Sequence, residues 1–531
     1  MKLSILNRWV RFFGLVLAVV LLQILLLAAP SFGTERVYAN FGPLERYVLV
    51  EDLFTYARTG ELPSELQILR RFLSPEQLEQ LRAGLSVSAD IDVVTVSQFL
   101  YTAQGEAILE WLGELIQTEG RQNGALAVRG ALILATADSD GGLNALNVLK
   151  HFPTQGARVD LRRLLGIARM AIEEINQTKA VTAQIFDQAK ADDAGADLVF
   201  RNLASQGPHA SDIVTLEQTT LPTDLYLPAG ENLPLAILSH GLGGDRTTLA
   251  YLARHLASHG FAVAVVEHPG SSAEQISELL SGQVGEAVEP EEMVRRPMDI
   301  RLLLDELETL TQTEPTLRNR LDFGHVGLLG QSMGAYTTLA LAGATISPDT
   351  LEESCPPQIN QLNLSLLLQC LVLSLPQPVP MLQDERVKAA IAINPLDSAV
   401  FGPAGMANIQ IPTMIVSGSD DTVTPALAEQ LRPFTWFNVP ERYLLLMEGG
   451  THFSAIYDPQ ASEDSIALPE EALGPNPQLA QDYIKAMSVA FLKTYLAEDE
   501  TYRQYLDSSY IAGLSQPELP VVLAHDVTIE D

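Results

Sequence analysis

The feature that most constrains this chain is a regular alternation of short apolar runs and helical stretches in residues 211–500. The runs are four to six residues long, rich in Val, Ile, Leu and Ala, and they lie at 235–239, 262–267, 326–330, 389–394, 414–417 and 443–447. Runs that are apolar on both faces are typical of strands in a buried parallel sheet. Helical periodicity follows most of them, at 247–258, 298–311, 335–344, 425–432 and 480–496. The alternation predicts a mostly parallel, doubly wound α/β sheet with reactive groups at the carboxyl ends of its strands.

One turn in this pattern carries a chemical signature. The sequence Gly330-Gln331-Ser332-Met333-Gly334 lies between the predicted strand 326–330 and the predicted helix that follows. A G-x-S-x-G sequence between a strand and a helix is typical of the nucleophile elbow, a tight turn that exposes a serine hydroxyl above the sheet. We therefore predict an α/β-hydrolase fold for residues 211–500, with Ser332 as the nucleophile.

A serine hydroxyl is a weak nucleophile, so it needs a general base. In this fold the chain order is serine, acid, histidine, and only His452 and His525 follow Ser332. His452 comes directly after the last apolar run, whereas His525 lies in the C-terminal segment 501–531, which we expect to be a tail. We predict that His452 is the base.

Three aspartates compete for the role of the acid that orients this base. Asp421 follows the predicted strand 414–417, and Asp420 is its neighbour. Asp397 follows the preceding strand, and some related hydrolases place the acid there. We predict Asp421 and keep Asp397 and Asp420 as alternatives.

A hydrolase of this kind also needs donors for the oxyanion that forms during acyl transfer. Ser239-His240-Gly241-Leu242-Gly243-Gly244 follows the first predicted parallel strand. We predict that the backbone N–H groups of Leu242 and Met333 form the oxyanion hole. His240 is expected to pack under the loop and hold it, and the role of His268 stays open.

The first 39 residues have the anatomy of a secretory signal. Lys2, Arg8 and Arg11 form a positive segment, residues 12–29 are almost wholly apolar, and the segments 31–33 and 37–39 loosely fit a small-x-small cleavage pattern. This pattern predicts export to the periplasm or the extracellular space. Because 18 apolar residues reach the lower limit for a membrane span, an uncleaved anchor is the alternative.

Three further segments surround the predicted hydrolase core. Residues 40–190 have helical periodicity and predict an all-helical N-terminal domain. Residues 345–386 interrupt the alternation as a cap insertion that is rich in Leu and contains Cys355 and Cys370. In an exported protein these two cysteines are expected to form a disulfide, with two free thiols as the alternative. The insertion is either a lid over the substrate or ordinary packing against the other domain.

Composition excludes several functions. The formal net charge of −33 argues against nucleic acid as a partner, because phosphate binding needs a basic surface. Two cysteines without nearby histidines cannot complete a tetrahedral zinc site, so no metal is expected. The predicted chemistry requires no cofactor, and membrane contact is expected only through an uncleaved N-terminal segment.

The stretch 238–268, LSHGLGGDRTTLAYLARHLASHGFAVAVVEH, resembles the platelet-activating-factor acetylhydrolase family. The elbow GQSMGA fits the same group and also its dienelactone-hydrolase-like and polyester-hydrolase relatives. The resemblance covers about residues 221–496. It implies that Ser332 and His452 belong to a catalytic triad and that Leu242 and Met333 supply the oxyanion hole. Residues 418–425 resemble the polyester hydrolases more closely than the acetylhydrolases. True dienelactone hydrolases have cysteine where Ser332 stands.

The segment from about residue 35 to 175, with Tyr-Ala-Asn-Phe-Gly-Pro-Leu-Glu at 38–45, resembles a domain of unknown function. That domain precedes α/β-hydrolase domains in exported bacterial proteins. Together these features predict a serine carboxylic-ester hydrolase that acts through an acyl-enzyme on lipid-like or short-acyl esters. An acyltransferase of the same fold and a non-catalytic binding or scaffold protein are the alternatives.

Overall fold

The computed structural model describes residues 33–41, 44–71, 74–89, 91–138, 142–191, 201–217, 219–355, 362–456 and 470–529. The chain forms two compact units, Met1–Ala168 and Arg169–Asp531. The expected signal segment lies outside the described residues up to residue 32. No helix within the described ranges is both long and apolar enough to cross a membrane.

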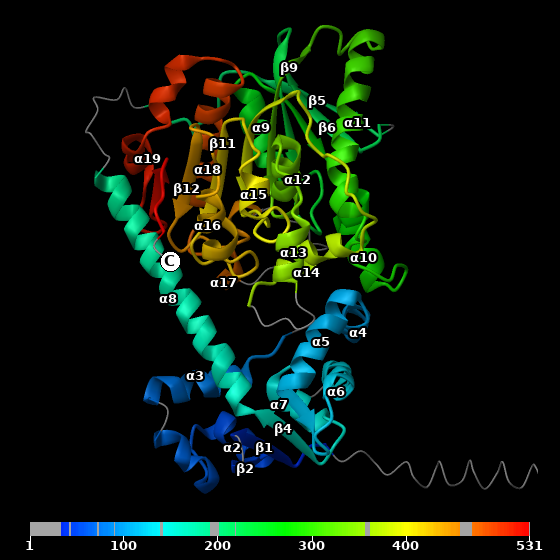
Figure 1. The fold of residues 1–531 in the computed structure, drawn as a ribbon, viewed down its shortest axis with the longest axis vertical. Coiled ribbons are helices and arrows are strands. Elements are labelled where there is room, and N and C mark those ends of the chain that lie inside the picture. The colour runs from blue at the N-terminus through cyan, green and yellow to red at the C-terminus, as the bar shows by residue number, and fades with distance from the viewer. Residues whose placement is uncertain are drawn as a thin grey trace, which may run out of the picture. The chain divides into compact units, whose positions relative to one another are not determined.

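The second unit contains a nine-stranded sheet in the order β13-β12-β11-β10-β9-β7-β8-β6-β5. Figure 1 labels β5, β6, β9, β11 and β12 of this sheet. The strands are β5 Ser211–Leu216, β6 Thr223–Pro228, β7 Leu233–Ser239, β8 Ala262–Val266, β9 Leu321–Gln331, β10 Val387–Ile393, β11 Thr413–Gly418, β12 Arg442–Met447 and β13 Val521–Ala524. The strands from β8 to β12 pair in parallel, and the pairs at both edges are antiparallel. All six predicted strands are present, and the predicted α/β-hydrolase fold is confirmed.

Helices cover both faces of this sheet because successive strand residues point to opposite sides. Ala236 and Leu238 of β7 pack in one buried cluster with α9, Ala250–Ser258, and α18, Pro477–Tyr495. Leu235 and Ile237 pack on the other face with α11, Glu292–Thr313. Helix α12, Met333–Ala342, also packs on that face, against β9 and β10. This arrangement places the carboxyl ends of the parallel strands at one edge of the sheet, where the site residues lie.

The C-terminal segment 501–531 differs from the expected tail. Its elements are η6, Glu500–Tyr505, α19, Ser508–Leu514, and β13, which pairs antiparallel with β12. His525 directly follows β13, and its ring lies against that of Tyr443, with centroids 4.7 Å apart. A run of four residues behind a proline carries too little periodicity to be recognised as a strand, and only pairing with β12 defines it.

The cap insertion packs on its own unit. It contains α13, Pro348–Ser354, α14, Leu366–Gln369, and η3, Cys370–Ser374, while residues 356–361 lie outside the described residues. Leu351, Leu366 and Val372 are buried in one cluster with Tyr336 of α12. The expected disulfide between Cys355 and Cys370 is confirmed.

Shorter helical elements lie in the connections between the strands of the second unit. They are η2 Pro269–Ser271, α10 Ala273–Leu280, α15 Gly402–Met406, the π-turn η4 Leu427–Leu431, α16 Arg432–Phe434, η5 Ser454–Ile456 and α17 Glu470–Leu473. Helix α11 begins six residues before the predicted start at Met298 and runs through Pro297. The proline therefore does not mark a helix start, and Arg296 lies within the helix.

The expectation of an all-helical N-terminal domain is wrong. The first unit contains a four-stranded sheet in the order β2-β1-β4-β3, formed by β1 Arg36–Phe41, β2 Leu44–Leu49, β3 Ile116–Thr118 and β4 Gly156–Asp160. Its helical elements are α2 Val50–Thr59, η1 Ser64–Arg71, α3 Pro75–Ser86, α4 Val93–Leu100, α5 Ala103–Leu115, α6 Ala125–Ala137 and α7 Ala145–His151. These strands are short and partly polar, and β1 pairs with β4, which lies more than a hundred residues away, so local periodicity does not reveal them.

Helix α8, Leu161–Ala191, runs across the boundary between the two units. Near its C-terminal end, Val181, Ile185 and Ala189 are buried in the cluster that contains Tyr336, so this end belongs to the hydrolase core.

Strand β1 begins within the range 1–39 that the signal pattern covers. Cleavage after Ala39 would remove four of the six residues of β1, whereas cleavage after Gly33 would leave the strand whole.

Candidate active site

Ser332 occupies the turn between β9 and α12 in a conformation that side chains rarely adopt. Its φ is 55° and its ψ is −117°, a strained combination that is typical of functional turns. An added Cβ at Gly330 would collide with the carbonyl oxygen of Gly334, and one at Gly334 would collide with that of Ser239. Both positions therefore require glycine, and the Ser332 N–H is fixed by the carbonyl oxygen of Ile393 at 2.9 Å.

His452 follows β12 and is hydrogen-bonded to the predicted acid. Its Nδ1 lies 2.9 Å from Oδ2 of Asp421, and both side chains are buried. Gln331 of the elbow donates through Nε2 to the carbonyl oxygen of His452 at 3.2 Å, which holds the histidine loop against the elbow. Within the described residues no hydrogen bond joins the Ser332 hydroxyl to His452. Such bonds often tighten only when substrate binds.

Asp421 is an acceptor for several groups that sequence reasoning did not identify. Its Oδ1 accepts from the backbone N–H groups of Val423 and Thr424, at 2.9 and 2.8 Å. Its Oδ2 accepts from Asn394 Nδ2 at 2.8 Å, Thr424 Oγ1 at 2.7 Å and Gln430 Nε2 at 3.1 Å. Burial alone would raise the pKa of Asp421, but the charge and hydrogen bond of His452 and the bonds from Thr424 bring this pKa below its usual value. The carboxylate is therefore held in its charged form, which can stabilise a cationic imidazole.

The two alternative acids have different surroundings. Asp420 is exposed, and its carboxylate accepts from the Ser419 hydroxyl at 2.8 Å. Asp397 is completely buried, and neither of its carboxyl oxygens has a hydrogen-bond partner within the described residues. Burial and the nearby charge of Glu429 raise the pKa of Asp397 well above its usual value. Of the three aspartates, the structure brings Asp421 to the histidine.

The predicted oxyanion loop lies against the elbow. A Cβ added to Gly241 would stand 3.2 Å from the Cβ of Ser332, so the backbone of the loop closely approaches the nucleophile. Met333 directly follows Ser332 and begins α12. Within the described part of the chain, the backbone N–H groups of Leu242 and Met333 donate to no protein acceptor. Two free donors beside a serine can stabilise a developing oxyanion.

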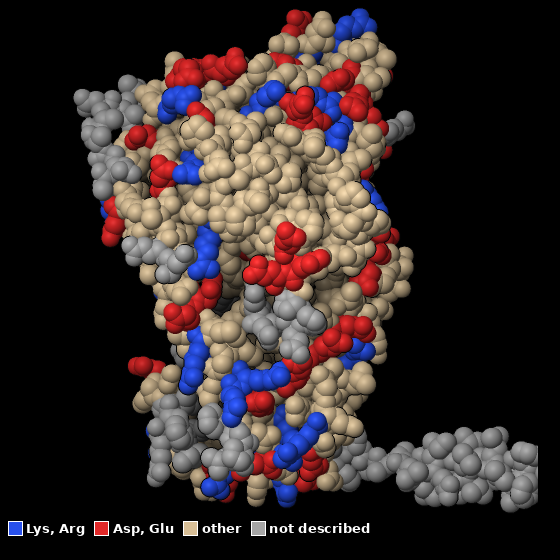
Figure 2. All heavy atoms as spheres, viewed as in Figure 1, with Lys and Arg blue, Asp and Glu red and all other residues tan. Residues whose placement is uncertain are grey.

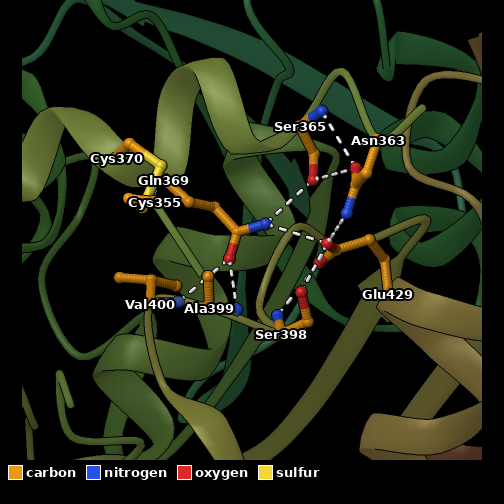
Figure 3. Close-up of a disulfide and its surroundings, with 9 residues drawn as sticks. All are labelled: Cys355, Asn363, Ser365, Gln369, Cys370, Ser398, Ala399, Val400 and Glu429. Carbon is orange, nitrogen blue, oxygen red and sulfur yellow. Dashed lines mark hydrogen bonds between the residues drawn. A yellow bond between two sulfur atoms is a disulfide. The ribbon is translucent and has the colours of Figure 1, made fainter. Parts of the chain in front are cut away.

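A buried polar cluster joins the cap insertion to the acid loop (Figure 3). Gln369, next to Cys370 of the disulfide, donates to Glu429 Oε1 at 3.0 Å and accepts from the N–H groups of Ala399 and Val400. Glu429 Oε2 also accepts from the backbone N–H groups of Asp397 and Ser398, at 2.8 and 2.9 Å. The next residue is Gln430, which contacts Asp421. A single π-turn thus links the cap to the acid.

Among the described residues, no group of three or more His, Cys, Asp or Glu side chains could hold a metal ion. On the face that Figure 2 shows, Lys and Arg are interspersed with Asp and Glu, and they form no continuous basic surface over the hydrolase unit.

The strand order and the nucleophile elbow define the class of α/β hydrolases. The family model for "Alpha/beta hydrolase of unknown function (DUF1400)" matches residues 33–160, within the first unit. The model for "Platelet-activating factor acetylhydrolase, isoform II" matches residues 211–320, from β5 to the end of α11 and its following loop. Both resemblances expected from the sequence are confirmed.

Curated proteins are similar to about half of this chain at low identity. Cutinase 1 of Thermobifida cellulosilytica is 23% identical over 292 residues, which cover 53% of this chain and 76% of the relative. Cutinase est1 of Thermobifida alba is 24% identical over 300 residues, or 55% and 70%. Platelet-activating factor acetylhydrolase of Cavia porcellus is 25% identical over 310 residues, or 52% and 61%.

Proposed function

We propose that the protein is a serine carboxylic-ester hydrolase. The observation that carries this proposal is the buried hydrogen bond between His452 and Asp421 beside the strained turn of Ser332. The similarity to cutinases and to a platelet-activating factor acetylhydrolase supports the same reaction class.

In the proposed reaction, His452 removes the proton of Ser332 as its oxygen attacks the ester carbonyl. Asp421 orients the imidazole and stabilises its cationic form. The N–H groups of Leu242 and Met333 stabilise the oxyanion, and His452 then protonates the leaving alcohol. Water, activated by the same histidine, releases the acid from the acyl-serine.

We further propose lipid-like or short-acyl esters as substrates. The cap insertion presents large apolar side chains to solvent, namely Leu362, Leu364, Leu373 and Met381. Exposed apolar surface can hold an acyl chain where it borders a catalytic serine, and we propose that the cap insertion borders Ser332 in this way. The insertion therefore acts as an apolar wall, although its helices pack on the hydrolase core.

The proposed function is tested with a fluorophosphonate probe and a series of p-nitrophenyl esters of increasing acyl length. Wild type should be labelled and hydrolyse the esters, whereas Ser332→Ala should lose both properties and His452→Ala should lose most of them. Labelling that persists in Ser332→Ala would reject this nucleophile. Activity that does not depend on acyl length would reject the role of the cap.

We also propose that the protein is exported. The signal-like N-terminal segment and the disulfide support an oxidising compartment. Removal of the signal before Arg36 would preserve β1.

A further inference from the structure

A completely buried arginine lies beneath the oxyanion loop. The side chain of Arg296, on α11, has no exposed surface. Its Nε donates to the Ser271 hydroxyl at 2.8 Å. Its two terminal nitrogens donate to consecutive backbone carbonyl oxygens, that of His240 at 2.8 Å and that of Gly241 at 3.5 Å. The guanidinium therefore contacts the loop that precedes Leu242.

The carbonyl of Gly241 belongs to the same peptide unit as the N–H of Leu242. Two further donors reach this carbonyl, because His240 Nδ1 lies 2.6 Å from the Gly241 oxygen and the Gly244 N–H donates to it at 3.2 Å. The other ring nitrogen of His240 accepts from the His268 N–H at 3.0 Å, which leaves the proton on Nδ1. Burial and the charge of Arg296 lower the pKa of His240 to about 3, so its ring is neutral at pH 7.

In a planar trans peptide the C=O and N–H groups point in opposite directions. Donors that hold the Gly241 oxygen on one side therefore fix the Leu242 N–H on the other side. They also polarise the peptide, which makes its N–H a stronger donor. The close approach of Gly241 to Ser332 places this peptide beside the reacting hydroxyl.

The buried charge of Arg296 is balanced by Glu292, one turn earlier on α11. Oε1 of Glu292 lies 3.7 Å from Arg296 Nε and accepts from the Ser271 hydroxyl at 2.7 Å. Its Oε2 lies 3.3 Å from the neighbouring Arg295, which is half-exposed. Burial lowers the pKa of Arg296 to about 10, and Glu292 opposes this effect, so the guanidinium stays charged at neutral pH. A buried ion pair contributes little net stability, since desolvation offsets its attraction.

We propose that Arg296, together with neutral His240, is a positioning residue of the oxyanion hole. It fixes and polarises the peptide that carries the Leu242 N–H, and it adds a preorganised positive charge beneath the site. This inference rests on the proposed ester hydrolysis. Since loss of one oxyanion donor costs about 100- to 1,000-fold in kcat, a residue that acts through that donor should cost roughly 10- to 100-fold.

The test compares Arg296→Gln, Arg296→Lys and the matched control Arg295→Gln in the full chain. Arg295 is adjacent on α11 and shares Glu292, but it makes no hydrogen bond to the oxyanion loop. The first measurement is kcat and KM for a p-nitrophenyl ester. The second is hydrogen exchange by mass spectrometry of peptides that cover residues 239–249, which reports loop rigidity without any reaction.

Arg296→Gln should lower kcat with little change in KM and should accelerate exchange in the loop. Arg296→Lys keeps the charge and part of the bonding, so it should lie between Arg296→Gln and wild type, and Arg295→Gln should match wild type. A double variant, Glu292→Gln with Arg296→Gln, removes both buried charges and replaces the single variant if that variant unfolds. It should show the same kcat loss and faster exchange.

The proposal is overturned if Arg296→Gln, or the double variant in its place, matches Arg295→Gln in kcat and in loop exchange. A change confined to KM would also overturn it, because that would indicate substrate binding. Absence of ester hydrolysis in wild type would reject the proposed function instead, while the exchange data would still decide whether Arg296 holds the loop.

Discussion

Two buried carboxylates beside the site differ in their partners. Asp421 accepts hydrogen bonds at both oxygens, whereas the carboxyl oxygens of Asp397 have none within the described residues. Their pKa values consequently shift in opposite directions, below the usual value for Asp421 and well above it for Asp397. A carboxylate that is held in its charged form can stabilise a cationic histidine, whereas the raised pKa of Asp397 disfavours its charged form.

Substitution by asparagine separates the candidates for the acid. Asp421→Asn should lower kcat by about 1,000- to 10,000-fold, because the amide neither carries the charge nor favours the correct histidine tautomer. Asp397→Asn and Asp420→Asn should retain kcat near the wild-type value. Steady-state kinetics on a p-nitrophenyl ester checks this, and a large loss in Asp397→Asn with a small one in Asp421→Asn would reverse the assignment.

Asp397 should also make stability depend on pH. The folded state favours its protonated form, so its contribution is complete below the unfolded pKa of about 3.9 and is lost as the pH rises toward the folded pKa. Over that range wild type should lose up to about 1.4 kcal/mol per pH unit relative to Asp397→Asn. Urea unfolding of both proteins between pH 4 and 8 measures the difference, and parallel pH profiles would contradict the prediction.

At the scale of elements, the π-turn Leu427–Leu431 contacts both the cap insertion and the predicted catalytic acid. Glu429 accepts hydrogen bonds from the cap insertion (Figure 3). The next residue, Gln430, donates to Asp421. π-Turns are frequent at functional sites. Here the π-turn places one side chain in contact with the cap insertion and the next side chain in contact with the acid.

Removal of the disulfide should therefore loosen the cap. Because the bond closes a segment with a sequence separation of 15 residues, Cys355→Ala with Cys370→Ala should lower the free energy of unfolding by about 2–4 kcal/mol. Urea unfolding of the oxidised protein and the double variant measures this. Glu429→Gln is the control, since it keeps the disulfide but weakens the buried cluster. An unchanged unfolding midpoint in the double variant would contradict the prediction.

At the scale of the whole molecule, the site depends on segments far apart in the chain. The residues of the proposed triad follow β9, β11 and β12, and the oxyanion loop follows β7. The sheet order places β7 and β9 side by side, so the oxyanion loop and the elbow become neighbours. Parallel pairing brings all these loops to the same edge of the sheet.

The sequence by itself determined the six central strands and the elbow at Ser332, since buried strands and a strand–turn–helix motif have strong local periodicity. It also led to the prediction of His452 as the base. It also indicated the disulfide, which follows from cysteine count and compartment.

Tertiary structure alone decided what depends on distant partners. The edge strands β5, β6 and β13 and the sheet of the first unit exist through pairing. Asp421 is distinguished from Asp397 by its hydrogen bonds. Arg296 is identified as a candidate positioning residue by its burial within a helix that runs through a proline. Local pattern does not report such contacts, because they are made between residues that only the fold brings together.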